Sequence, residues 1–373
     1  MKIVYIVNAR LPNKKAYGIQ VAKMCEAFVE AEIDLELVIP RTHASSIATL
    51  KDAYKLRVDI PTTILPGLDL YASGRIPFFI SSCVFIITSS IYLLWKRMRG
   101  EGCIVYTIDM DTFSFSLLPL LGFPVVAEMH DIKPCNIFTR FFFKHVKLLV
   151  VTNTQIRDAL CDRFDISSDK TIIEPNGVDL DLFAHASSQG EVRKRLHIPQ
   201  DKKIALYVGR FYEWKGLDIL VDAAKQAPAL DWYVVGDTTE VFTKVTGRTS
   251  LPANLHIAGE CEPSDVPLWL AAADTLLILG TKHNDQSYRH TAPMKVYEYM
   301  AARRPIVASH TPALTSIIGE SDAIWYEPDD AESLARATER AITEPNPNTM
   351  ERNLRSAQAH SWAARVDRIT SLF

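Results

Sequence analysis

Two basic side chains follow a short apolar run in the segment YVGRFYEWKGLDIL, residues 207–220, and their placement suggests anion chemistry. The run ends at Gly209, and Arg210 and Lys215 lie in the loop that leads into the next helical pattern. Glycine lets a ligand approach the backbone closely, and the free amides of a helix N-terminus favour anions. The segment therefore predicts a cradle for a diphosphate. The alternative is a solvated loop with ordinary surface charges, because short glycine and lysine patterns recur by chance.

A second segment, RHTAPMKVYEYMAARRPIVAS, residues 289–309, has the residues of a ribose site. We expect Thr291 to cap a helix that has Pro293 in its first turn. Lys295 and Glu298 would then lie three residues apart on one face of that helix, near its positive end. A carboxylate there can accept hydrogen bonds from both ribose hydroxyls, while the ammonium group holds phosphate. The alternative is a surface ion pair, worth only about 0.2–0.5 kcal/mol.

A single histidine stands at a position where parallel sheets bind ligands. His130 follows the apolar run VVAE within EMHD, at the expected carboxyl end of a strand, and we interpret it as a site residue rather than a structural one. The triplet DMD at 109–111 has the form of a metal-binding motif, but it lies where a helix should start. We therefore interpret Asp111 as an N-cap. No essential metal is predicted, since Arg210, Lys215 and helix N-termini can do the same electrostatic work.

The elements that must position these residues alternate regularly. Short β-branched runs are followed by longer helical patterns, which is typical of parallel sheets covered by helices. In the first half we expect strands at 3–7, 35–39, 103–107, 125–128, 148–152 and 171–173, and helices at 19–31, 112–121 and 154–163. In the second half strands should begin at Lys203, Trp232, Leu255, Thr275, Pro305 and Ala323, and a helix should span 329–342.

The composition changes once, after PNGVDLDLF at 175–183, to the small and polar AHASSQGEVRKR. This change indicates a connection between two domains, with a boundary near 180. We predict an α/β protein with two Rossmann-like, doubly wound domains that face each other across a cleft. Ligands bind such sheets outside the carboxyl ends of the strands, so we expect the chemistry to lie between the domains.

Charge and cysteine content exclude several classes of protein. The 373 residues include 41 Lys and Arg against 44 Asp and Glu, a net charge of -3, so we expect no nucleic-acid partner and only local anion sites. The six cysteines lack CxxC pairs and zinc-site spacing. The opening MKIVYIVNA lacks the long apolar stretch of a signal peptide, so we expect a reducing, cytoplasmic location.

One apolar segment leaves three interpretations open. Residues 76–95, IPFFISSCVFIITSSIYLLW, are uncharged over about the length that crosses a bilayer, and Lys96, Arg97 and Arg99 follow. A core helix on a parallel sheet is favoured, and a helix in a membrane interface or a true membrane span are the alternatives. The aromatic and basic run FTRFFFKHVK, residues 138–147, has the same ambiguity between packing inward and contacting a membrane surface.

Taken together and in this order, the segments resemble the retaining glycosyltransferases of family 4, which have the GT-B fold. The resemblance covers nearly the whole chain and rests on NARLPNKKAYGIQVAKMCEAF, VAEMHDI, PNGVD, GRFYEWKG, HIAGE and TAPMKVYEYMAARRPIVAS. It implies an N-terminal acceptor-side domain at 1–180 and a C-terminal nucleotide-sugar binding domain at 181–373. The last helix is a candidate to pack back on the first domain.

The resemblance also implies roles for single residues. Arg210 and Lys215 match the pair that neutralises the donor diphosphate, and Glu298 matches the carboxylate that binds the nucleotide ribose. Gly18, at the start of the first helix, matches a glycine whose backbone approaches the donor phosphate and the acceptor. His130 matches a histidine that contacts the transferred sugar.

One departure from the family pattern affects the sugar site. Many members have a Glu separated by seven residues from the ribose carboxylate, and here that position is His290. This puts in doubt any acid or base role at His290. It suggests instead that backbone amides near Thr291, within 291–294, hold the sugar.

The expected activity is transfer of a sugar from a nucleoside-diphosphate sugar to a hydroxyl acceptor with retention, without a metal or other cofactor. A nucleotide-sugar epimerase or phosphorylase and a non-catalytic nucleotide-sugar binding subunit on the same fold are the alternatives. A glycan or lipid-linked acceptor would suit a cytoplasmic enzyme with peripheral contact to the inner surface of the membrane.

Overall fold

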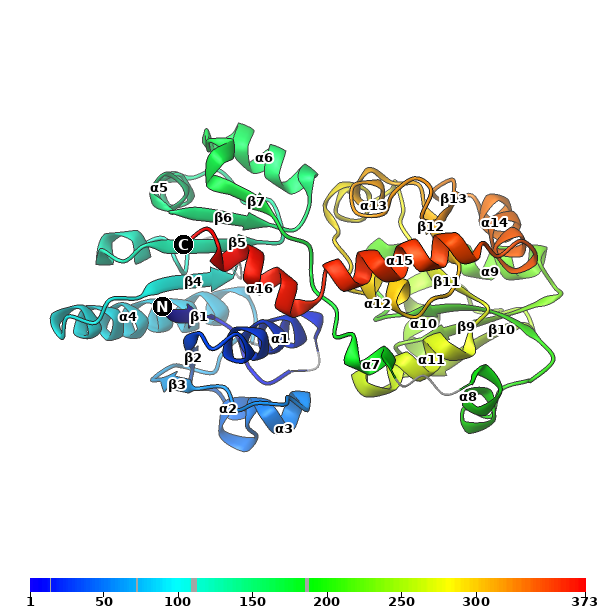
Figure 1. Cartoon of the computed structure of the whole chain (residues 1–373), viewed down its shortest axis with the longest axis horizontal. Coiled ribbons are helices and arrows are strands. Elements are labelled where there is room, and N and C mark those ends of the chain that lie inside the picture. The colour runs from blue at the N-terminus through cyan, green and yellow to red at the C-terminus, as the bar shows by residue number, and fades with distance from the viewer. Residues whose placement is uncertain (14, 72, 109–112, 185–187) are drawn as a thin grey trace. The chain divides into compact units, whose positions relative to one another are not determined.

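The computed structural model describes residues 1–13, 15–71, 73–108, 113–184 and 188–373. These residues form two compact units, of which the first comprises Met1–Asn176 with Trp362–Phe373 and the second comprises Gly177–Ser361. The chain leaves the first unit after Asn176 and returns to it for its last helix, drawn in red beside the blue helix α1 (Figure 1). Each unit is built on one parallel sheet flanked by helices, so the predicted α/β class is confirmed.

The first unit contains a seven-stranded sheet with the strand order β3-β2-β1-β4-β5-β6-β7, and all of its neighbouring strands are parallel. Val, Ile and Leu dominate these strands because a sheet covered on both faces must be apolar on both. The strands are β1 (Lys2–Ile6), β2 (Asp34–Pro40), β3 (Thr62–Leu65), β4 (Ile104–Ile108), β5 (Val125–Met129), β6 (Leu148–Val151) and β7 (Thr171–Ile173). The sequence prediction missed β3, an edge strand in which only Leu65 is buried.

One face of the first sheet is covered by four elements whose apolar residues share a single core, among them Phe85, Leu118, Phe142 and Ile156. These elements are α4 (Arg75–Met98), the 3-10 helix η1 (Leu118–Leu121), α5 (Ile137–His145) and α6 (Thr154–Phe164). Helix α1 (Ala16–Glu30) packs against α16 (Trp362–Thr370), and Phe28 of α1 contacts the ring of Tyr106 in β4. The short elements α2 (His43–Ile47), α3 (Leu50–Tyr54) and η2 (Ser168–Lys170) complete the unit.

The second unit contains a six-stranded parallel sheet with the order β10-β9-β8-β11-β12-β13. All six strands were predicted, and they are β8 (Lys203–Val208), β9 (Leu230–Val235), β10 (Leu255–Gly259), β11 (Thr275–Ile278), β12 (Ile306–Ser309) and β13 (Ile324–Tyr326). Two separate apolar clusters show that helices cover both faces. One face carries α8 (Gln189–Arg195), α11 (Val266–Ala272), α12 (Lys295–Ala301), α13 (Pro312–Thr315) and α15 (Pro347–Ala359).

The opposite face of the second sheet carries α9 (Ile219–Gln226), α10 (Thr239–Thr246) and α14 (Ala331–Thr343). Helix α14 matches its prediction closely, because the Asp330 side chain accepts a hydrogen bond from the Ser333 amide at 2.9 Å and fixes the start of the helix. The remaining short elements are α7 (Asp181–Ala184), η3 (Glu213–Lys215), η4 (Pro263–Asp265) and η5 (Gln286–His290).

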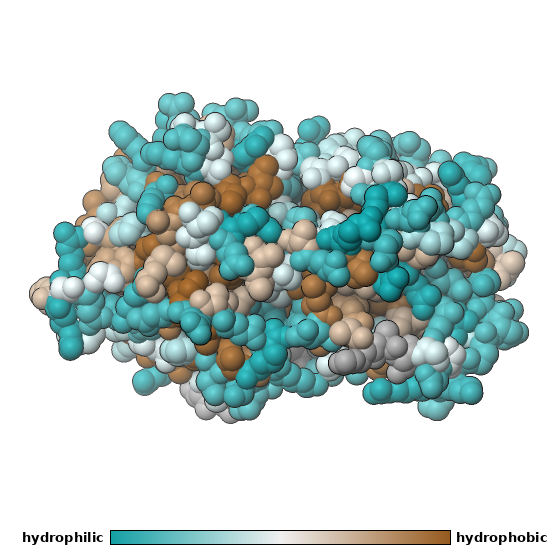
Figure 2. All heavy atoms as spheres, in the orientation of Figure 1, coloured by the Kyte–Doolittle hydropathy of each residue, from teal (hydrophilic) through white to brown (hydrophobic). Residues whose placement is uncertain are grey.

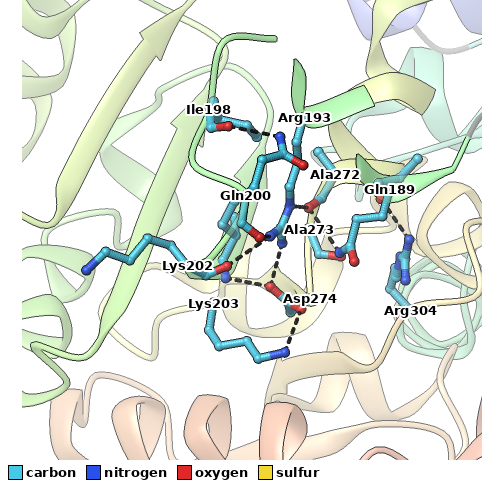
Figure 3. Close-up of polar contacts among 12 residues, drawn as sticks. Gln189, Arg193, Ile198, Gln200, Lys202, Lys203, Ala272, Ala273, Asp274 and Arg304 are labelled. Carbon is cyan, nitrogen blue, oxygen red and sulfur yellow. Dashed lines mark hydrogen bonds and ion pairs between the residues drawn. The ribbon is translucent and has the colours of Figure 1, made fainter. Parts of the chain in front are cut away.

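A polar network fastens α8 to the strands of the second sheet (Figure 3). The buried Arg193 donates to Asp274 Oδ2 at 2.7 Å and to the carbonyls of Ala272 and Lys202 at 2.9 Å each. Asp274 also accepts from the Ile204 amide at 2.8 Å. Because these groups are largely buried, they are satisfied by partners within the protein, and the network holds α8 against the second sheet.

One expectation for the first unit needs correction, and one open interpretation can be compared with the structure. The helix expected at 112–121 is wrong within the described part, 113–121, where turns lead to the short η1, because Pro119 and Gly122 break the pattern. The apolar segment 76–95 lies within the 24-residue helix α4, which packs on the sheet as the favoured interpretation expects. It packs on the sheet through residues such as Phe85 and Leu93, yet it is the one helix in the described ranges that is long and apolar enough to cross a membrane.

Candidate functional site

The strands of the second sheet end on glycines at the edge where the predicted donor residues lie. Gly209 and Gly236 follow β8 and β9 with φ angles of 145° and 152°, which side chains rarely tolerate. A Cβ on Gly236 would lie 2.1 Å from the carbonyl oxygen of Gly209, so the two strand ends are packed backbone to backbone. At this edge a ligand would contact main-chain atoms. The charged groups around it come from the loops and helices that follow the strands.

Two lysines lie at this edge with depressed basicity. Lys215, the last residue of η3, donates to the Arg210 carbonyl at 3.3 Å, and burial lowers the pKa of its ammonium group to about 8. Lys295, the first residue of α12, has its Nζ 3.8 Å from the centre of the Tyr207 ring. Burial and the charge of Lys215 together hold the pKa of Lys295 well below its ordinary value. Neither lysine forms an ion pair with any described acidic residue, so the pair is suited to receive an anion.

Lys295 also lies close to Gly209, the glycine that follows β8. A Cβ added to Gly209 would lie 2.8 Å from Lys295 Nζ and 3.5 Å from Tyr207 Oη. The absence of a side chain at Gly209 thus allows the ammonium group of α12 to approach the backbone of the β8 loop. This contact connects the two sequence segments from which the site was predicted.

Arg210 lies in the same loop but is already paired. Its Nη1 is 2.8 Å from Asp237 Oδ1 and 2.8 Å from Glu260 Oε1. Asp237 also accepts from the Phe211 amide at 2.8 Å, which fixes the carboxylate after β9. Arg210 is about two-fifths exposed, at 38%, so a diphosphate can reach it while competing with Glu260 and Asp237. Sequence reasoning missed these two acids.

Glu298 lies in the first turn of α12, close enough to Lys295 for each to affect the pKa of the other. Burial raises the pKa of Glu298, and the charge of Lys295 offsets part of that rise. The surface ion pair considered from the sequence is absent, since no contact within 4.0 Å joins the described side chains of Lys295 and Glu298. The expectation that Thr291 caps this helix is wrong, because α12 begins only at Lys295, after Met294, and Thr291 follows η5.

His290 ends η5, a single π-helical turn that contacts η3, the turn that carries Lys215. Its ring is mostly buried, at 13% exposed, and Nε2 lies 4.0 Å from Asp285 Oδ2. Thr291 follows with extended backbone. The structure thus brings Gly209, Arg210, Lys215, His290, Thr291, Lys295 and Glu298 into one region of the second unit.

In the first unit, His130 follows β5 and contacts a buried carboxylate. Its Nε2 lies 2.6 Å from Oε1 of Glu128, two residues earlier, and its ring is 26% exposed. The same Oε1 accepts from Gln20 Nε2 at 2.8 Å and from Arg365 Nη2 at 2.8 Å, and Tyr106 donates its hydroxyl to Oε2. The network holds Nε2 of the His130 ring, while part of the residue remains exposed.

Arg365 reaches this network from the last helix of the chain. It is fully buried, as is Glu128, and it also donates to the Pro175 carbonyl at 2.8 Å. Burial alone would raise the pKa of Glu128, but the Arg365 guanidinium and the hydrogen bonds from His130 and Tyr106 lower it to about 2. No sequence pattern indicates this pair, whose members lie 237 residues apart.

Gly18 is buried near the start of α1 and has a packing role of its own. A Cβ there would lie 2.3 Å from Tyr54 Oη and 2.8 Å from Asn13 Oδ1. Tyr54 in turn accepts from the Asn13 amide at 2.7 Å. The DMD triplet at 109–111 lies outside the described residues. No cluster of three or more metal-ligating side chains occurs in the part of the chain that the structure describes.

Comparison with known proteins identifies the second unit. Residues 188–359 match the family of glycosyl transferases group 1. The match includes Arg210, Lys215, Lys295 and Glu298. Residues 188–359 are thus identified as a group 1 glycosyltransferase domain.

Two curated relatives show how far the similarity of this chain extends. It is 29% identical over 169 residues to the putative teichuronic acid biosynthesis glycosyltransferase TuaC of Bacillus subtilis (strain 168), covering 44% of this chain and 40% of that protein. It is 22% identical over 290 residues to the UDP-Gal:alpha-D-GlcNAc-diphosphoundecaprenol alpha-1,3-galactosyltransferase of Escherichia coli, covering 74% and 70%. The aligned part spans only 40% to 60% of the length of the first four curated relatives.

A solved structure identifies the fold of this chain. HepE from Anabaena, determined in complex with UDP, superposes with a TM-score of 0.74 and 16% identity over 100% of this chain and 99% of that one. The predicted GT-B fold is confirmed by this likeness.

Proposed function

We propose that this chain transfers a sugar from a nucleoside-diphosphate sugar to a hydroxyl group of an acceptor, with retention of the anomeric configuration. The observation that supports this most directly is the pair Lys215 and Lys295. Both lysines have a lowered pKa and no ion pair with a carboxylate among the described residues; Lys295 lies beside the backbone of Gly209, and Lys215 donates to the carbonyl of the next residue, Arg210. Such a pair is costly unless an anion compensates it, and a diphosphate supplies that charge.

In the proposed donor complex each residue of the second unit has a separate task. Lys215, Lys295 and Arg210 neutralise the diphosphate, and Glu298 accepts hydrogen bonds from the ribose hydroxyls. Backbone amides within 291–294 and the neighbouring His290 hold the sugar. Arg210 exchanges part of its contact with Glu260 for a phosphate oxygen, because Glu260 is the more exposed of its two partners, at 52%.

Electrostatic stabilisation of the leaving group is the proposed source of the rate. The bond between the anomeric carbon and the β-phosphate oxygen breaks, and the acceptor oxygen bonds to the same face of that carbon. The acceptor proton passes to the departing phosphate oxygen, so no enzyme nucleophile is needed. Negative charge grows on the β-phosphate as the bond breaks, and preorganised cations stabilise that state more than the ground state. The mechanism requires no metal ion.

His130 is the proposed contribution of the first unit to the sugar site. The family resemblance suggests that its ring contacts the transferred sugar, and Gly18 is proposed to let the α1 backbone approach the donor phosphate and acceptor. Glu128 supports the proposal for His130, because its 2.6 Å contact fixes the orientation of the ring. Glu128 and Arg365 are positioning residues in this proposal.

The finer proposals concern the acceptor and the location. We propose a glycan or lipid-linked acceptor in cell-surface polysaccharide synthesis, and a cytoplasmic enzyme in peripheral contact with the inner face of the membrane. The name of the Escherichia coli relative supports a lipid-linked acceptor, because it specifies a diphosphoundecaprenol substrate. The Bacillus relative is named for teichuronic acid biosynthesis, which supports a cell-surface product.

The decisive experiment measures nucleotide binding and donor turnover separately. Thermal shifts with UDP, GDP, ADP, TDP and CMP identify the base, and UDP is the first choice because HepE was solved with it. Release of nucleoside diphosphate from the matching sugar donor is then measured with wild type and Lys215→Ala. A rise in melting temperature without release of nucleoside diphosphate would favour a non-catalytic binding subunit. Conversion of the donor sugar to its epimer, with nucleotide still attached, would favour an epimerase.

A further inference from the structure

Helix α4 has its apolar face outward. Residues Phe85, Ser89, Leu93 and Lys96 are buried against the first sheet, at the spacing of one helical face. The opposite face exposes Ile76 (74%), Phe79 (53%), Ile80 (43%), Ile87 (59%), Ile91 (61%), Leu94 (45%), Trp95 (43%) and Met98 (80%). A helix on the surface of a soluble protein normally shows the reverse pattern, so the exposed face of α4 requires a partner.

The apolar surface continues onto the next two elements of the same unit. The 3-10 helix η1 contacts α4, where Arg97 donates to the Leu121 carbonyl, and α5 contacts η1. Leu117 (43%), just before η1, and Leu120 (65%), within it, are exposed, and so are Ile137 (78%) and Phe138 (54%) at the start of α5. We call the outer side of these three elements the α4–η1–α5 surface. Hydrophobic side chains reach the visible face of the first unit in Figure 2.

The charged residues within α4, η1 and α5 are all basic, and the acid that follows α4, Glu101, pairs with Arg99 at 3.3 Å. The sequences of α4, η1 and α5 contain no Asp or Glu, although the whole chain has 44 acidic residues and a net charge of -3. Exposed basic residues border the apolar side chains: Arg75, Arg97 and Arg99 at the ends of α4, and Arg140 and Lys144 on α5. Arg99 stacks on the Trp95 ring at 4.6 Å. An apolar surface with a basic border is complementary to a bilayer with anionic head groups.

We propose that the α4–η1–α5 surface binds an anionic phospholipid bilayer, with the exposed Ile, Leu and Trp side chains at the boundary between head groups and acyl chains. This inference deepens the proposed membrane location and does not depend on sugar transfer. The helix lies on the bilayer and does not cross it. Lys96, buried on the inner face, pairs with Glu36 at 2.8 Å and Glu101 at 3.0 Å, and extraction of the helix from the sheet would break that cluster and expose the core around Phe85.

The test is flotation of the full chain with lipid vesicles, without donor or acceptor. One set of vesicles contains phosphatidylcholine alone, and the other contains phosphatidylcholine mixed with phosphatidylglycerol. The wild type should float with the anionic vesicles, float less with the neutral ones, and detach partly as salt is raised. Failure to float with either vesicle would overturn the inference, whereas loss of transferase activity alone would not bear on it.

Two variants separate the apolar and the charged contributions. Ile87→Ser with Ile91→Ser should weaken binding to anionic vesicles roughly tenfold or more. Arg140→Gln with Lys144→Gln should weaken it roughly fivefold per charge, about 25-fold together, and mainly at low salt. Leu182→Ser is the matched apolar control, since Leu182 is 47% exposed in the second unit. Lys225→Gln with Lys244→Gln, two exposed lysines of α9 and α10, is the matched charge control.

The controls also exclude other partners. Circular dichroism and the nucleotide thermal shift should be unchanged in every variant, because none of these residues belongs to the proposed donor site. If the control variants lose binding as much as the surface variants, the surface is not specific and the inference is wrong. If the apolar variant leaves flotation unchanged but abolishes self-association in size-exclusion chromatography, the partner is a second copy of this chain and the inference is also wrong.

Discussion

Replacement of Arg365 by Met should destabilise the first unit by removing the only guanidinium that contacts the buried Glu128 among the described residues. Arg365 and Glu128 are both completely buried, and Arg365 Nη2 lies 2.8 Å from Glu128 Oε1. The folded unit holds the pKa of Glu128 at about 2, against an ordinary value of 4.5. This difference, at ~1.4 kcal/mol per pKa unit, corresponds to about 3 kcal/mol of stability at neutral pH. Loss of one partner from a buried ion pair costs about 3–5 kcal/mol by independent reasoning.

Hydrogen exchange is the appropriate assay, because it reports each unit of the protein separately. In Arg365→Met, the opening free energy of amides in β5 and α16 should fall by about 3 kcal/mol, while amides in β8 of the second unit should not change. The double variant Glu128→Gln with Arg365→Met removes the unpaired charge and should recover more than half of that loss. A loss below about 1 kcal/mol in the single variant, or no recovery in the double, would refute the argument.

The pH dependence gives the sign of the same effect. Because the folded state lowers the pKa of Glu128, the associated stability is fully present above the ordinary value of 4.5. It should be lost as the pH falls from there to about 2, where the carboxylate becomes protonated in the folded state too. Glu128→Gln should therefore show a flatter decline in β5 protection over this acidic range than the wild type.

Three further predictions concern the donor site. Lys215→Ala should lower turnover by roughly two to three orders of magnitude, the scale for losing one preorganised oxyanion donor. The control Lys225→Ala, at an exposed lysine, should leave steady-state turnover within about twofold, the scatter of such an assay. A loss under about fivefold for Lys215→Ala would show that Lys215 does not belong to the site. Glu298→Ala should abolish the preference for UDP over 2′,3′-dideoxy-UDP in calorimetric titrations, and retention of that preference would place the ribose elsewhere. Because the pKa of Lys215 is about 8, nucleoside-diphosphate affinity should fall as the pH rises above that value, and binding at pH 8 should take up ~0.5 proton per site, measured by calorimetry in buffers of different ionisation enthalpy.

The sequence predicted the elements that local pattern determines. Short β-branched runs indicate buried strands such as β8 and β12. The loop with Arg210 and Lys215 directly follows the end of β8. The predictions failed where tertiary contacts decide. The edge strand β3 has too few buried residues for a clear pattern, and the start of α12 moves from Thr291 to Lys295 because the π-helical turn η5 occupies the preceding residues.

Contacts between residues that are distant in the chain could not be predicted from one sequence. Glu128 lies in an ordinary strand pattern, and no residue near it in sequence indicates that Arg365 pairs with its carboxylate. Asp237 and Glu260 each follow a strand of the second sheet, so their position at a carboxyl edge was the available signal, and their pairing with Arg210 depends on the order of β8, β9 and β10.

The buried charged groups of the two units differ in whether the protein itself supplies a partner, and this difference distinguishes a structural role from a functional one. Glu128 receives hydrogen bonds from four side chains, and its ionised state is stabilised within the first unit itself. Lys215 donates to a carbonyl and Lys295 lies over an aromatic ring; burial disfavours the charged form of both, and the charge of Lys215 adds to this effect on Lys295. A fold selected for stability alone would place an acid between them, as it does for Lys96 with Glu36 and Glu101. These two lysines, which have no ion pair among the described residues, therefore point to a charge that arrives with the ligand, because buried groups whose charge is only partly compensated persist where function requires them.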